Sequence, residues 1–222
     1  ALHFNRAVRY APTMAESMLI TTKRHAYDMN VKLAADAEGR LTAFFCDFTM
    51  NKGAYTVNGP VILGRAIMMI QGSYHIPNLK VFGKNVYTNN SFTGSARGAG
   101  PPQTAFAAES AVDMLAARIG IDPLDFRRMN ALKPGQSKAT GMAVKEWSFV
   151  EVCDAIKPAY ERAKREAAEF NAQGGVVKRG VGIAAFSFGI GAAGDKAKLS
   201  IEINPDDSFT VYAASADPGE GN

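Results

Sequence analysis

A glycine-rich run divides the strand-like first part of this chain from its helical middle. Residues 95–103 read Ser-Ala-Arg-Gly-Ala-Gly-Pro-Pro-Gln, and an apolar pattern with helical spacing follows directly. Because Gly98 and Gly100 carry no side chain, their peptide groups can come close to a ligand. The positive end of the following helix and the guanidinium of Arg97 both favour oxygen anions at the same spot. The run therefore predicts a cradle for an oxyanion or an oxo ligand, and the alternative is a surface turn with a solvated arginine.

The segments before this run predict mainly β-structure. Residues 28–34 alternate in polarity, Glu38-Gly39 marks a turn, and residues 41–48 are apolar and rich in aromatic side chains, so together they predict a hairpin. Residues 61–70 are apolar enough for a short buried helix, and residues 80–88 predict another strand.

After the run the pattern becomes helical and then mixed. Apolar residues recur at spacings of three and four between residues 103 and 120, and Asp122-Pro123 supplies the N-cap and the first position of a second, short helix. Ser148 can cap a long helix that continues to Glu169. Residues 176–216 predict strands broken by glycines, with a hairpin turn at residues 204–207.

These segments predict a mixed α/β (α+β) fold organised in two parts. Residues 133–147 show no periodicity and contain Pro134, Gly135 and Gly141, which makes them the best candidate for a linker. We therefore place a domain boundary near residue 145, with one domain over residues 1–145 and a second over residues 146–222.

Charge, cysteine content and hydropathy exclude several classes of protein. The 25 Lys and Arg residues against 21 Asp and Glu residues give a net charge of only +4, scattered along the chain, which does not favour nucleic-acid binding. The two cysteines, Cys46 and Cys153, are too few for an iron–sulfur cluster or a cysteine-rich zinc site held by this chain alone. Because no membrane span and no signal peptide is visible, we expect a cytoplasmic location.

Both ends of the sequence look cut. The chain begins at Ala1 and stops at Asp-Pro-Gly-Glu-Gly-Asn, directly after a strand-like run at residues 209–213. Glycines and an acid after a strand usually build a loop that leads to another element. We therefore expect a piece of a longer polypeptide, and the alternative is a small complete protein.

Arg65 is a lone charge inside the apolar segment at residues 62–68. A buried charge needs a partner or a function, whereas an arginine at the edge of a helix can extend its guanidinium into water. The residue alone leaves both interpretations open.

Several sequence blocks, taken together, are typical of one family. They are residues 19–25 (Leu-Ile-Thr-Thr-Lys-Arg-His), 72–78, 88–89, 97–103 (Arg-Gly-Ala-Gly-Pro-Pro-Gln), 122–130, 178–182 and 219–221. In these blocks, which are distributed over nearly the whole length of the chain, the sequence resembles the molybdenum-binding region of the xanthine oxidase family of molybdenum hydroxylases. Within the family it looks most similar to the bacterial aldehyde oxidoreductases of sulfate reducers.

The resemblance implies a fold, a cofactor and a reaction. The fold would be part of a two-domain molybdenum-binding region, and the cofactor would be molybdenum held by molybdopterin cytosine dinucleotide. The reaction would oxidise an aldehyde to a carboxylic acid with water as the oxygen source, and electrons would leave through two [2Fe-2S] clusters on parts of the protein outside this chain. The partners implied are the remaining segments of the same enzyme, an electron acceptor such as flavodoxin or ferredoxin, and a second copy in a homodimer.

The resemblance also implies roles for individual residues. Arg97 would lie beside the molybdenum ligands, with Gly98 and Ala99 in the same loop, and Arg65 would stabilise negative charge that develops on the substrate. The other positions implied are Asn58, Val61 and Ala99 at the substrate, and Pro218, Gly219 and Glu220 next to the pterin. In relatives that oxidise purines a phenylalanine stacks on the substrate at the position of Ala99, so the methyl group here favours an aldehyde.

The chain departs from the family pattern in what it contains. The cysteines of the clusters, the Gly-Phe loop near the apical oxo group and the glutamate base have no counterpart in it. We therefore expect about half of a molybdenum site. Two alternatives stay open: a purine or N-heterocycle hydroxylase of the same family, and a structural relative without catalytic activity.

Overall fold

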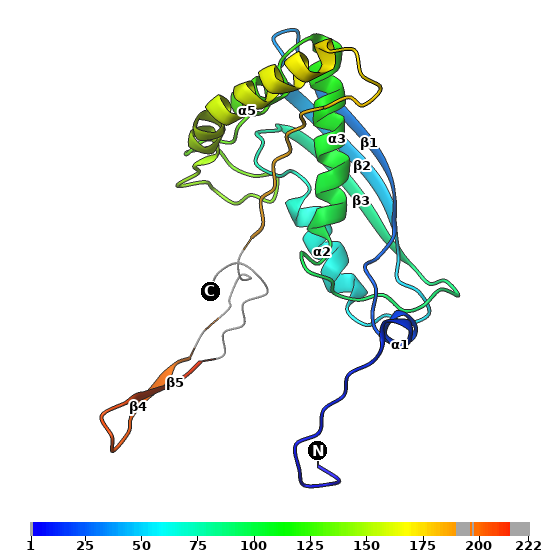
Figure 1. The fold of residues 1–222 in the computed structure, drawn as a ribbon, viewed down its shortest axis with the longest axis vertical. Coiled ribbons are helices and arrows are strands. Elements are labelled where there is room, and N and C mark those ends of the chain that lie inside the picture. The colour runs from blue at the N-terminus through cyan, green and yellow to red at the C-terminus, as the bar shows by residue number, and fades with distance from the viewer. Residues whose placement is uncertain (1, 190–195, 197, 214–222) are drawn as a thin grey trace. The chain divides into compact units, whose positions relative to one another are not determined.

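Figure 1 shows the computed structural model of the chain, which describes residues 2–189, 196 and 198–213. The chain divides into two units, Ala1–Phe188 and Gly189–Asn222. In chain order, the first unit contains α1 (Met14–Ile20), β1 (Tyr27–Ala35), β2 (Leu41–Asn51), α2 (Gly59–Met69), β3 (Asn78–Val86), α3 (Pro101–Ile119), α4 (Pro123–Met129) and α5 (Phe149–Ala172), and the second contains β4 (Ser200–Ile203) and β5 (Phe209–Tyr212). The predicted mixture of helices and strands is thereby confirmed.

The first unit is built on a three-stranded sheet with β2 in the centre. β2 runs antiparallel to β1 and parallel to β3. Cys46 of β2 lies opposite Val31 of β1 and opposite Val81 of β3. The predicted hairpin of β1 and β2 is confirmed, and its turn is closed by the backbone N–H of Arg40, which donates to Asp36 Oδ1 at 2.7 Å. The parallel connection from β2 to β3 passes through α2, as a parallel pair requires.

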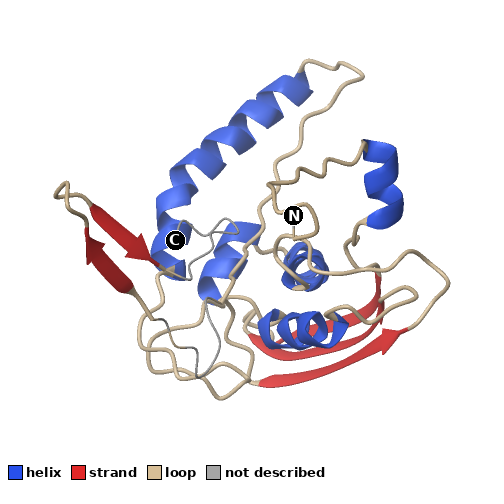
Figure 2. Ribbon diagram, turned by 90° about the horizontal axis from the view of Figure 1, so that it is seen from below, coloured by secondary structure: helices blue, strands red, loops and turns tan. Residues whose placement is uncertain are grey.

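α2 and α3 cover one face of this sheet (Figure 2). From Phe44 onward every second side chain of β2 is buried, and the buried residues of this strand belong to the core cluster; they are Leu41, Phe44, Cys46, Phe48 and Met50. α3 contributes small or branched residues, among them Ala108, Val112 and Ala116, which let its backbone approach the sheet closely. The core of the first unit therefore lies between the sheet and these two helices.

A charged group centred on Glu109 and Arg127 is buried next to this core. The Glu109 carboxylate of α3 accepts hydrogen bonds from the Tyr74 hydroxyl at 2.6 Å, from Arg127 Nε at 2.9 Å and from the Ala185 backbone N–H at 2.8 Å. Arg127 of α4, which is only 1% exposed, also pairs with Asp113 at 2.7 Å. Burial, reinforced by the adjacent carboxylate, raises the pKa of Tyr74 far above its usual value. These contacts join two helices, the loop before β3 and residues 184–186 in one place.

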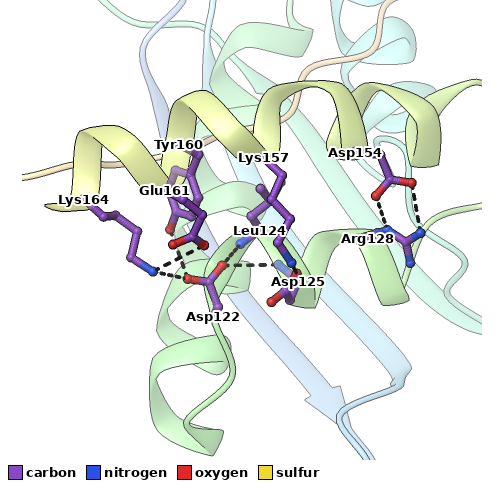
Figure 3. A network of polar contacts seen from close by, with 9 residues as sticks. All are labelled: Asp122, Leu124, Asp125, Arg128, Asp154, Lys157, Tyr160, Glu161 and Lys164. Atoms are coloured by element: carbon purple, nitrogen blue, oxygen red, sulfur yellow. Dashed lines mark hydrogen bonds and ion pairs between the residues drawn. The ribbon is translucent and has the colours of Figure 1, made fainter.

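Solvent-accessible ion pairs connect α4 to α5 (Figure 3). Arg128 holds Asp154 with two hydrogen bonds of 2.6 and 2.9 Å, and Lys157 lies 2.6 Å from Asp125. Cys153 and Tyr160 pack beneath these pairs against Leu124 of α4. The apolar contact and the ion pairs together fix α5 along α4.

The start of α4 agrees with the sequence because a side chain caps it, whereas Ser148 precedes α5 as predicted but its side chain makes no capping hydrogen bond. Asp122 is the predicted N-cap of α4, and its Oδ1 accepts the backbone N–H of Leu124 at 2.8 Å. α3 begins at Pro101, two residues earlier than predicted, because proline is tolerated at the first helical positions. None of the described helices is both long enough and apolar enough to cross a membrane.

The strand prediction for residues 176–216 is only partly correct. In the described residues of this range only β4 and β5 pair, as an antiparallel hairpin, while residues 176–189 lie outside any helix or strand. A strand is stable only with a partner, and the sequence pattern does not reveal whether a partner is within reach. The hairpin places Ile201 opposite Val211 and Ile203 opposite Phe209. The predicted boundary near residue 145 lies in the loop between α4 and α5 and stays a prediction.

Replacing Arg127 by methionine should lower the free energy of unfolding by about 3–5 kcal/mol, because the buried Glu109 carboxylate would lose its counter-charge. Urea denaturation of the complete protein measures this loss. Arg128→Met serves as the matched control, since Arg128 pairs with Asp154 in water, and it should have a much smaller effect. Equal effects of the two variants would contradict the importance of the buried group.

Asp122 should make stability depend on pH. Although partial burial opposes it, the hydrogen bonds from Lys164 and from the start of α4 hold the pKa of Asp122 below its ordinary value of 3.8. A lowered pKa in the folded state contributes stability that is fully present above 3.8 and is lost as the pH falls through the folded value. Asp122→Asn keeps an N-cap acceptor but not the charge, so the urea midpoint of this variant should fall less on acidification. An unchanged acid dependence would contradict this role.

Candidate functional site

The glycine-rich run forms a tight turn in front of α3. The backbone N–H of Ala99 donates to the carbonyl oxygen of Ala96 at 2.7 Å and closes the turn. Three successive residues have positive φ angles: 93° at Gly98, 38° at Ala99 and 107° at Gly100. We call residues 94–100 the Arg97 loop.

The two glycines of this loop are required by packing. A Cβ atom on Gly100 would lie 2.6 Å from the carbonyl oxygen of Ile62 in α2, and one on Gly98 would lie 2.4 Å from Cγ of Pro102. Their positive φ angles are also strained for any residue with a side chain. The glycines thus allow the loop to pack closely against α2 and α3. The sequence predicted a different reason for them, the close approach of the backbone to a ligand.

Residues 22–25 form the back of the Arg97 loop. Lys23 and Thr93 form a parallel bridge, and the Lys23 carbonyl oxygen accepts the N–H of Gly94 at 3.0 Å. Arg24 Nη2 donates to the carbonyl oxygen of Arg97 at 2.7 Å. One turn into α3, Gln103 Nε2 donates to the carbonyl oxygen of His25 at 3.0 Å. The Arg24 contact spans 73 positions of the sequence, and no sequence signal pointed to it.

The loop presents hydrogen-bond donors that have no acceptor. Among the described residues, the backbone N–H groups of Arg97, Gly98 and Gly100 meet no protein acceptor. The first two residues of α3 are prolines without an N–H, so the loop supplies these donors while the helix supplies only its dipole. The Arg97 side chain is exposed. Successive free amides next to a guanidinium fit an anionic group rich in oxygen.

The electrostatic surroundings favour the same ligand. From residue 48 to residue 108 the sequence contains no Asp or Glu, but it contains five basic residues: Lys52, Arg65, Lys80, Lys84 and Arg97. α2 and the first turn of α3 therefore bring no carboxylate to the loop. A group that carries negative charge meets no repulsion from this part of the chain.

The N-terminal half of α2 lies beside the Arg97 loop. Asn58, its N-cap, donates a hydrogen bond from Nδ2 to Ser95 Oγ. Val61 is 61% exposed, and Arg65 is half-buried and takes part in no ion pair among the described residues. Spacings of three and four place these side chains on one face of the helix. Ala99 packs against the core, while Pro218, Gly219 and Glu220 lie outside the described residues.

A second polar cluster, which the sequence did not predict, lies at the adjacent ends of β2 and β3. The Lys52 ammonium lies 3.6 Å from the ring centroid of Tyr87, and Thr56 is hydrogen-bonded to the Tyr87 hydroxyl. This hydrogen bond and the nearby ammonium lower the pKa of Tyr87. Lys52 is only 7% exposed, and its backbone carbonyl oxygen accepts a hydrogen bond from the N–H of Thr93 at 3.2 Å. The cluster therefore supports the segment that leads into the Arg97 loop.

Comparison with known proteins bears on the family of the chain. Two family models match the chain, over residues 1–131 and 155–222, and each describes a molybdopterin cofactor-binding domain. The aldehyde oxidoreductase of Megalodesulfovibrio gigas is 34% identical over 222 residues, which cover 100% of this chain and 24% of that protein. The large molybdopterin subunit of nicotinate dehydrogenase from Eubacterium barkeri is 35% identical over 161 residues, which cover 72% of this chain and 37% of that subunit.

Solved structures agree. The aldehyde oxidoreductase from Desulfovibrio gigas superposes with a TM-score of 0.80 at 35% identity, over 87% of this chain and 21% of that one. Quinoline 2-oxidoreductase from Pseudomonas putida 86 has a TM-score of 0.83 at 23% identity, over 99% of this chain and 30% of that one, and shows the shared fold alone.

The chain belongs to the molybdopterin cofactor-binding domain family. More narrowly, it is a piece of the molybdenum-binding region of the xanthine oxidase family of molybdenum hydroxylases, which confirms the prediction from its sequence. It spans about a quarter of the length of the M. gigas aldehyde oxidoreductase.

Replacing Gly100 by alanine should lower the free energy of unfolding by about 1–3 kcal/mol, because the new Cβ would meet backbone and the φ angle would be strained. Gly64→Ala is the matched control: Gly64 lies inside α2 with open space around it, so alanine should stabilise the helix by roughly 0.5–1 kcal/mol. Urea denaturation of both variants of the complete protein provides the measurement. A neutral Gly100→Ala would contradict the packing role of this glycine.

Proposed function

We propose that this chain is the central part of the molybdenum-binding region of an aldehyde-oxidising hydroxylase that produces carboxylic acids. The observation that carries the proposal is the Arg97 loop, which combines free backbone N–H groups with an exposed guanidinium and lies in a stretch of sequence, residues 48–108, without Asp or Glu. Such a set of donors is preorganised for negative charge that develops on oxygen during a reaction.

The residues of the loop fit a molybdenum cofactor by the chemistry of their donors. Arg97, Gly98 and Ala99 would face the oxygen ligands of the metal, and we assign contacts with the pterin to Pro218, Gly219 and Glu220. Molybdopterin cytosine dinucleotide, when bound, supplies the two-electron chemistry and the oxygen that comes from water. The protein contributes binding, orientation and electrostatic stabilisation.

The substrate side of the proposal rests on α2. Asn58 and Val61 would line the approach to the site, and Arg65, on the same face of the helix, would stabilise a developing alkoxide. Ala99 offers only a methyl group for contact with the substrate, which favours an aldehyde over a flat ring that needs a stacking partner.

The second candidate function is hydroxylation of an N-heterocycle. Its support is the similarity to a nicotinate dehydrogenase subunit at 35% identity and to a xanthine dehydrogenase molybdenum-binding subunit of Escherichia coli O157:H7 at 30% identity. A panel that pairs aldehydes with purines and pyridine carboxylates distinguishes the two, since each candidate predicts turnover of only one group of substrates.

The complete enzyme requires further parts. We propose that two [2Fe-2S] clusters and the rest of the molybdenum domains come from other segments of the same enzyme. A flavodoxin or a ferredoxin would accept the electrons, and the enzyme would form a homodimer in the cytoplasm. Metal analysis of the complete protein tests the cofactor: about one molybdenum per chain agrees with the proposal, and none indicates a structural relative without catalytic activity.

Replacing Arg97 by alanine in the complete enzyme should reduce kcat by roughly 10²–10³-fold, the effect of losing one donor at a preorganised site. Steady-state kinetics on protein with a measured molybdenum content provides the test. Arg118→Ala removes an exposed arginine from the last turn of the same helix and should leave kcat unchanged. Normal turnover of a fully metallated Arg97→Ala enzyme would contradict the role given to Arg97.

A further inference from the structure

The peptide group between Arg97 and Gly98 is the centre of the turn formed by residues 96–99. The 2.7 Å hydrogen bond from Ala99 to Ala96 closes this turn, and a φ of 93° at its third residue is typical of a type II turn. Type I and type II turns differ mainly in the direction of this central peptide. The direction decides on which side of the loop the N–H of Gly98 lies.

Glycine at position 98 leaves both directions open to the backbone. A residue with a side chain would favour type I, whereas glycine adopts positive and negative φ about equally well. Gly98 is therefore needed for the observed turn but does not select it. Another interaction has to hold the central peptide in one direction.

Arg24 makes that interaction. Its guanidinium donates to the carbonyl oxygen of Arg97 at 2.7 Å, from a segment that the Lys23–Thr93 bridge fixes behind the loop. In a trans peptide the C=O and N–H bonds point in opposite directions. With the oxygen held by Arg24, the N–H of Gly98 points away from Arg24, and it is one of the donors without a protein acceptor among the described residues.

We propose that Arg24 is a positioning residue that locks the Arg97–Gly98 peptide and so presents the Gly98 N–H to the anionic ligand of the loop. The proposal rests on the proposed function for the identity of that ligand. The proposal assigns the fixed direction of this peptide to the Arg24 hydrogen bond and not to the positive charge of residues 22–25. The neighbouring Lys23 ammonium does not contact this peptide: it lies 2.7 Å from the Ser17 carbonyl oxygen and 2.6 Å from that of Thr21.

Amide hydrogen exchange of the complete protein, with and without bound cofactor, tests the lock directly. Arg24→Met should speed exchange in the peptides that cover residues 97–100 in both forms and should reduce the protection that the cofactor gives. Arg24→Lys, which can still donate to the carbonyl, should restore part of that protection. Lys23→Met removes one positive charge at the adjacent position and should leave exchange in these peptides unchanged.

Kinetics supplies a second readout. Arg24→Met should lower kcat about tenfold, the weight of one charge-assisted hydrogen bond, and should leave KM within about twofold, since the interaction acts on the transition state. Unchanged exchange and kcat in Arg24→Met, or the same changes in Lys23→Met, would overturn the proposal.

The outcomes separate this proposal from the proposed function. If the enzyme contains molybdenum and needs Arg97 while Arg24→Met behaves as the unmodified protein does, the positioning role alone fails. If the protein contains no molybdenum, the proposed function fails, and exchange in the cofactor-free form still decides whether Arg24 fixes the peptide.

Discussion

The buried carboxylate of Glu109 is the interaction on which the first unit depends. It receives hydrogen bonds from three separate parts of the chain: Tyr74 before β3, Arg127 in α4 and the backbone at Ala185. A buried ion pair is expensive to form, and removing either partner leaves a charge without compensation. The group therefore joins α3, α4 and residues 184–186 at one place, and each of its members depends on the others for compensation of the buried charge.

The candidate site is connected to this arrangement through α3. The Arg97 loop enters the first turn of the helix, and Glu109 lies farther along the same helix. Gly100 rests on α2 at one side of the loop, and Arg24 holds the Arg97 carbonyl at the other. Because each support comes from a different part of the chain, the conformation of the loop is set by its neighbours and not by the loop alone.

Local features of the fold could be predicted from the sequence, and contacts between distant segments could not. The β1–β2 hairpin and the Asp122 cap follow from patterns within a few residues. The contact of Arg24 with the Arg97 carbonyl depends on a backbone atom, which no residue pattern encodes. The strand pattern of residues 176–189 was misleading because it records burial preference but not the presence of a neighbouring strand. The glycine-rich turn before α3 was predictable, while the contacts that support it were not.

The tight seating of the two glycines limits how this loop can vary during evolution. Neither Gly98 nor Gly100 has room for even a methyl group. Steric clash therefore disfavours substitution at these positions, whatever the chemistry of the new side chain. Between them, Ala99 is already a residue with a side chain in the same left-handed region. Variation in and around the loop is therefore sterically easier at Ala99 or at the exposed Val61 of α2 than at either glycine.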